Sequence, residues 1–247
     1  MRRIIGQRPA LRRTVLRGTV LRGTVLRRAA AAAVVAAGAL TLAGCGQTQL
    51  GAAALYSNQR ISSSKLADEV SNLNTGYQAD KSKVQIGYKP AAMPRQVLTW
   101  MLRFATTEQV ARRTGLAVTP HQAQLQLDAE KARAAQSGDT LSEAAVLNGL
   151  PPDLLPELGR WIAIQVKLQA RLDNGVPPTT TAQQQALVLK VNHVQCLAAK
   201  SMNIRVNPQY GAFDYRQFIV VPAPSTLAAA PASKPSTSPP PQLTPKC

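Results

Sequence analysis

Apolar residues recur every three or four positions through most of residues 53–221, and this spacing predicts a mainly α-helical domain. A chain of this length can bury one sizeable core. Cap signals, prolines and glycines divide the pattern into successive helices. These helices are expected after a cap at Ser62–Ser64, over Pro94–Arg113, from Pro120 to about Gln136, from Thr140 through Leu147, after Gly149–Pro152 to Asn174, and from Thr181 to about Met202.

Local signals fix several helix ends. Thr119 and Gln122 have the spacing of a capping box, with Pro120 at the first helical position. Gly115 stands where a helix C-cap is favoured. Gly76 is expected to interrupt the first helix.

Short strands are expected at the two ends of the domain. Ala53–Tyr56 and Arg60–Ile61 flank the turn-prone Ser57–Gln59, which predicts an opening hairpin. Ile204–Val206 and Phe218–Val221 are the later strand candidates. One of these two is expected to pair with the opening strand.

The first 44 residues have the pattern of a bacterial export signal. Residues 1–28 contain nine arginines and no acid, which favours retention of this end in the cytosol. The apolar segment Ala29–Ala43 has 15 residues, fewer than the about 20 that span a bilayer as a helix, and it suits the core of a signal peptide.

Leu42, Ala43, Gly44 and Cys45 close this segment and resemble a bacterial lipobox. The small residues before the cysteine admit a peptidase, and the Cys45 thiol accepts a thioether-linked lipid. Cleavage between Gly44 and Cys45 would leave a lipid-anchored protein on the extracytoplasmic face of the cell membrane. An ordinary secretory signal with a chance cysteine is the alternative.

The export route and the true start of the leader stay open. Arg12–Arg17 resembles a twin-arginine signal, but an arginine-rich leader produces such matches easily, so general secretion is the alternative. Thr14–Arg28 repeats every five residues, a period that matches neither helix nor strand. A downstream start, for example at Val25, is a further alternative.

Charge and aromatic content argue against a nucleic-acid ligand. The full chain has a formal charge of +17, but cleavage after Gly44 removes nine of 29 basic residues and leaves 20 against 12 acids, a charge of +8. Aromatic residues make up 4% and do not alternate with basic clusters, so stacking platforms for bases are missing. The remaining charge favours contact with anionic lipid headgroups or wall polymers.

Residues 45–52 are expected to form a tether, and the chain changes character again after Val221. Pro222–Cys247 contains eight prolines in 26 residues, a composition that predicts a disordered, extended tail. Outside the cytosol a disulfide between Cys196 and Cys247 is allowed, but separate free thiols are the expected state.

Candidate catalytic and metal-binding residues are few. His193 and Cys196 lie three positions apart on the last helix, where a Cys-His nucleophile or a two-ligand metal site is the open enzyme hypothesis. No third ligand or orienting carboxylate is near in sequence, and a helical cysteine is more often a small buried residue. The acid pairs Asp68–Glu69 and Asp128–Glu130 are expected to be solvated. The sequence therefore predicts no enzyme activity, no metal and no cofactor.

Three segments resemble the SurA N-terminal chaperone domain. The first is the opening strand and turn that lead into Arg60–Ser62 and the first helix. The second is Thr114–Thr119, a helix end that leads through a short apolar stretch into a capped helix. The third is Asn207–Gly211 with Phe213–Asp214, as in the lipoprotein branch of that family, where a basic residue is more usual than Gln209.

The resemblance spans nearly all of residues 53–221 and implies a holding chaperone that shields unfolded or exported polypeptides. Relatives often add a parvulin-type prolyl isomerase domain, which is not expected here after residue 221. A chaperone needs an apolar client groove, and the candidates for lining it are Trp100, Met101, Phe104 and Trp161, unless these large side chains fill the core. A non-catalytic scaffold or interaction lipoprotein of the cell envelope is the alternative function.

Overall fold

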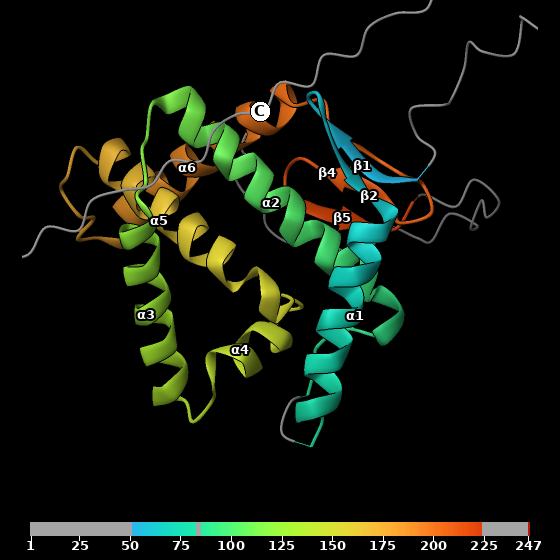
Figure 1. Cartoon of the computed structure of the whole chain (residues 1–247). Coiled ribbons are helices and arrows are strands. Elements are labelled where there is room, and N and C mark those ends of the chain that lie inside the picture. The colour runs from blue at the N-terminus through green and yellow to red at the C-terminus, as the bar shows by residue number, and fades with distance from the viewer. Residues whose placement is uncertain (1–50, 83–84, 224–246) are drawn as a thin grey trace, which may run out of the picture. The chain divides into compact units, whose positions relative to one another are not determined.

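The computed structural model describes residues 51–82, 85–223 and 247, which all belong to one compact unit of the chain, Gly46–Cys247. Within them the fold is mainly helical with short strands, as the sequence predicts (Figure 1). The elements in chain order are β1 (Ala52–Tyr56), β2 (Gln59–Ser62), α1 (Ser63–Asp80), η1 (Pro90–Ala92), α2 (Met93–Thr114), α3 (Pro120–Gln136), α4 (Leu141–Leu147), η2 (Pro152–Leu154), α5 (Leu155–Leu172), α6 (Thr181–Ser201), β3 (Arg205–Val206), β4 (Ala212–Asp214) and β5 (Ile219–Val221).

Helix boundaries follow the local cap signals. The Thr119 hydroxyl accepts a hydrogen bond from Gln122 N at 3.2 Å, and the Gln122 side chain accepts one from Thr119 N at 3.1 Å, which completes the capping box of α3. Gly115 ends α2 with a left-handed φ of 65°, which a residue without Cβ adopts at low cost. These predicted boundaries are confirmed.

Two small antiparallel sheets are formed by strands from the two ends of the domain. β1 and β2 form the predicted hairpin, and β3 pairs with the other edge of β1, where Ala54 lies opposite Val206. The second sheet joins β4 to β5. The sequence gives β4 no strand signal of its own, and β4 forms because the turn at residues 215–218 brings β5 beside it.

The main core lies between the three-stranded sheet, α1, α2 and the end of α6. Its largest side chains are fully buried: Leu66 and Leu73 of α1, Leu98 and Leu102 of α2, and Met202 after α6. In Figure 1 the strands lie beside α1 and α2. The removal of these apolar side chains from water is the main stabilising contribution at this end of the domain.

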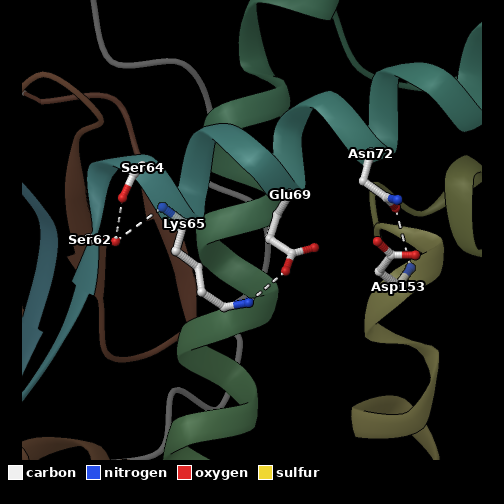
Figure 2. A network of polar contacts seen from close by, with 6 residues as sticks. All are labelled: Ser62, Ser64, Lys65, Glu69, Asn72 and Asp153. Atoms are coloured by element: carbon white, nitrogen blue, oxygen red, sulfur yellow. Dashed lines mark hydrogen bonds and ion pairs between the residues drawn. The ribbon is translucent and has the colours of Figure 1, made fainter.

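Helix α1 carries an ion pair in which one partner is buried. The Ser62 hydroxyl caps the helix by accepting from Lys65 N at 3.1 Å, and Lys65 Nζ reaches Glu69 Oε1 at 2.9 Å (Figure 2). Glu69 is only 6% exposed, so the expectation of a solvated carboxylate is wrong at this position. The reason is that α1 packs against α2 as well as against α4 and η2. The Asn72 side chain accepts from Asp153 N at 3.3 Å across the contact with η2.

Gly76 does not interrupt α1, which continues to Asp80. A Cβ at this position would lie 2.9 Å from Cγ2 of Val146 on α4 and 3.3 Å from Cγ of Pro152 on η2. The lack of a side chain therefore lets both elements approach α1 closely. The predicted interruption is wrong because this packing outweighs the low helix propensity of glycine.

Cys196 and Cys247 are joined by a disulfide, with their Cα atoms 5.6 Å apart. Cys196 is buried on α6, and Lys200 Nζ donates to the Cys247 carbonyl oxygen at 2.9 Å. The expectation of separate free thiols is therefore wrong. The sequence allows this disulfide but does not favour it over free thiols, because the two cysteines lie 51 positions apart.

Some sequence predictions fall outside the described residues. Residues 1–50 hold the predicted signal peptide, the lipobox with Cys45 and most of the tether, and residues 224–246 hold most of the predicted tail. In the described part of the chain, no helix has the length and the apolar character needed to cross a bilayer.

Candidate binding groove

Helices α3 to α6, with one side chain from α2, form an apolar groove of about 740 Å³. In Figure 1, α3, α4 and α5 lie on the opposite side of α2 from the strands. The groove stays open because α3, the helix beside α5, is polar and buries only Ala134. The lining side chains are those of Trp100, Glu130, Arg133, Ala134, Ser137, Asp139, Leu141, Ala144, Ala145, Asn148, Leu150, Leu158, Trp161, Ile162, Gln165, Val166, Gln169, Gln184, Leu187, Val188, Val191, Asn192 and Gln195.

Two tryptophans from different helices meet in the groove. Trp100 and Trp161 pack edge to face with ring centroids 5.9 Å apart, and Trp100 Nε1 donates to Asn148 O at 2.9 Å. Met101 and Phe104 pack, as Trp100 also does, against the buried Ala145, Leu150 and Leu154, but they are not among the lining residues. The structure therefore brings two of the four candidate residues into the groove and places the other two against the core.

Aliphatic side chains stay open to solvent on the two helices that flank the groove. Val166 of α5 is 48% exposed and Val188 of α6 is 46% exposed, and both line the groove. A single exposed valine needs no explanation. Val166 and Val188, however, line the same concave surface as the two tryptophans. An apolar patch of this kind in a groove is typical of a binding site.

The same two helices contribute uncharged amides to the groove. Gln165 and Gln169 line it from α5, and Gln184, Asn192 and Gln195 line it from α6. An amide both donates and accepts hydrogen bonds, so it can pair with either group of a peptide backbone. These residues carry no distinct signal in the sequence, because glutamine on a helix also suits a plain solvated face.

The charged side chains of the groove come from α3 and from the turn that follows it. Glu130 and Arg133 form an ion pair with each other, and Asp139 lies in the turn before α4. The charge is therefore confined to one end, and the walls formed by α5 and α6 are apolar or amide-bearing.

A second, smaller pocket of about 290 Å³ adjoins the groove, because Trp161 and Gln195 line both cavities. Its other lining residues are Arg103, Thr106, Thr107, Gln217 and Phe218. The Arg103 guanidinium donates through Nε to Phe218 O at 3.0 Å and stacks over the Trp100 ring at 5.2 Å from the centroid. Burial lowers the pKa of Arg103, although an arginine keeps its charge at neutral pH.

The open enzyme hypothesis at His193 and Cys196 loses its nucleophile in this structure. The Cys196 sulfur is bonded to Cys247, so no thiolate is present, while His193 lies exposed on α6. Across residues 51–82 and 85–223, no three histidine, cysteine, aspartate or glutamate side chains gather closely enough to hold a metal ion.

Comparison of the chain with protein-family models, with curated proteins and with solved structures finds no significant match. The groove and the pocket beside it are therefore the observations from which a function can be inferred.

Proposed function

We propose that the protein is a membrane-anchored holding chaperone with a SurA-N-like domain, without isomerase activity of its own. Lipid on Cys45 would attach it to the extracytoplasmic face of the cell membrane. Its groove would bind unfolded or exported polypeptides and keep their apolar segments from aggregating. The observation that carries the proposal is the apolar groove of about 740 Å³ with Trp100 and Trp161 inside it.

The chemistry of the groove suits an unfolded chain rather than one defined small molecule. Tryptophan and valine surfaces attract apolar side chains of many shapes, since the hydrophobic effect is not directional. The amides of α5 and α6 are placed to pair with peptide groups, which every polypeptide carries.

A scaffold lipoprotein that binds one folded envelope partner is the second candidate. Trp100 and Trp161 favour it, because tryptophan is enriched among the residues that dominate the binding energy of specific interfaces. The two candidates differ in the folding state of the bound protein, which can be tested directly.

A charge placed in the groove should weaken client binding. In Val188→Glu the carboxylate would have to lose water to bind an apolar client segment, so suppression of aggregation by residues 46–247 should fall several-fold. Light scattering of several chemically unfolded clients at near-stoichiometric ratio measures this effect. Leu197→Glu is the matched control, because Leu197 is also on α6, is 42% exposed and does not line the groove.

The proposal fails if the unmodified protein protects none of the clients, or if Val188→Glu protects as well as Leu197→Glu. Crosslinking in the native host separates the two candidates. Many partly synthesised or newly exported chains support the chaperone, whereas one folded partner supports the scaffold.

Anchoring has its own test. Each buried methylene of an acyl chain contributes about 0.8 kcal/mol to membrane binding, so two or three chains on Cys45 hold the protein almost permanently. Cys45→Ala should therefore abolish radiolabelled fatty-acid incorporation, while Cys247→Ala should keep the label. Incorporation by the Cys45 variant, or an intact leader on protein isolated from its native host, would contradict the assignment.

A further inference from the structure

Two nearly buried threonines of α2 differ in their hydrogen bonding. Thr99 is 4% exposed, and its hydroxyl accepts from Val220 N at 2.9 Å. Thr106, two turns further along the helix, is 2% exposed, and its Oγ1 has no hydrogen-bond partner in the part of the chain that the structure describes. Thr106 lines the smaller pocket. Buried polar atoms without a partner are rare, and each calls for an explanation such as a ligand.

Arg103 lies one helical turn before Thr106 and lines the same pocket. Its Nε donates to Phe218 O at 3.0 Å, while none of the ion pairs between described residues involves its guanidinium. Among the described residues, no acidic side chain lines the pocket. The terminal nitrogens of this arginine therefore offer donors to an anion in a partly desolvated place, where a charge-assisted hydrogen bond is strong.

The composition of the pocket favours a carboxylate over a phosphate. A planar guanidinium matches the two oxygens of a carboxylate, and the Thr106 and Thr107 hydroxyls can add neutral donors. A doubly charged phosphate would meet only one cation among the lining residues. Trp161 and Phe218 supply aromatic walls, and about 290 Å³ leaves room for a side chain next to the carboxylate.

We propose that this pocket binds the C-terminal carboxylate of a polypeptide whose preceding residues lie in the apolar groove. Trp161 and Gln195 line both cavities, so a single extended chain can occupy the groove and end at Arg103. This inference rests on the proposed function, because it takes the ligand to be a polypeptide. The pocket would select the charged C-terminal end of a polypeptide, whereas the apolar groove alone would not distinguish between apolar segments.

The test compares three forms of one fluorescent apolar peptide on the full-length protein purified in detergent. The first has a free C-terminal carboxylate, the second is amidated, and the third is amidated with a glutamate as its last residue. The acid should bind at least tenfold more tightly than the amide, which corresponds to about 1.4 kcal/mol. Fluorescence anisotropy titration measures the three dissociation constants.

Two variants connect this preference to the pocket. Thr106→Val keeps the shape of the side chain, removes the unpaired hydroxyl, and should weaken binding of the acid several-fold without changing binding of the amide. Arg103→Gln should remove the preference for the acid altogether. Val188→Glu in the groove should weaken all three peptides by a similar factor.

Each outcome has a defined meaning. Equal binding of acid and amide overturns the carboxylate site but leaves the chaperone proposal standing, provided that Val188→Glu weakens both peptides. Equal binding of the acid and the glutamate-ended amide overturns the assignment to the chain end. If none of the peptides binds, the carboxylate site and the proposed function both fail.

Discussion

On the strand side of α2, the side chains of Leu73, Val97 and Leu98 have no exposed surface, whereas on the groove side Val166 and Val188 leave almost half of theirs open. Both sides are built largely from helices. The difference lies in what covers them, because β3 and β5 return from the C-terminal end of the domain to pack against β1 and α2.

Among the described residues, no strand covers the groove side in this way. Helix α3 packs against α5 but is polar along most of its length, and Val166 of α5 stays half-exposed in the groove. The apolar surface that remains does not contribute to folding as the core does, since it stays in contact with water. The main core and the open apolar groove thus lie on opposite sides of α2.

The largest expected effect that tests this difference between the two sides of α2 is a change in the free energy of unfolding. Leu98→Ala should lower the free energy of unfolding by about 2–5 kcal/mol, because it removes a fully buried side chain and leaves a cavity. Val188→Ala should change it by no more than about 0.5 kcal/mol, as surface substitutions usually do. Urea unfolding followed by circular dichroism measures both. Similar losses in the two variants would mean that the groove side is part of the stabilising core.

The features that could be predicted from the sequence are those with local causes. The capping box at Thr119 and Gln122 and the left-handed cap at Gly115 depend only on neighbouring residues, and the structure has both. The opening hairpin likewise follows from a turn between two short apolar runs. Helix number and approximate bounds therefore came from the sequence alone.

The features that the sequence analysis missed depend on distant parts of the chain. Glu69 is buried because α4 and η2 pack across α1, and Cys196 meets Cys247 across 51 positions. Arg103 stands between two apolar residues in the sequence, which could have marked it as unusual. Nothing in the sequence indicated that Thr106 would face it in a pocket. Lipidation and the chaperone activity stay predictions.

The smallest expected effect separates Thr99 from Thr106, which lie two turns apart on the same face of α2 but differ in whether the hydroxyl has a partner. Thr99→Val should lower the free energy of unfolding by about 1–3 kcal/mol, because it leaves the buried Val220 N–H without an acceptor. Thr106→Val removes a hydroxyl that has no partner among the described residues, so it should leave stability unchanged or raise it by up to about 1 kcal/mol. Thermal unfolding of the two variants beside the unmodified protein measures the difference. The two substitutions make the same chemical change on one helix, and each is the control for the other. A loss at Thr106 as large as that at Thr99 would show that its hydroxyl stabilises the fold, and the reason for placing a ligand there would disappear.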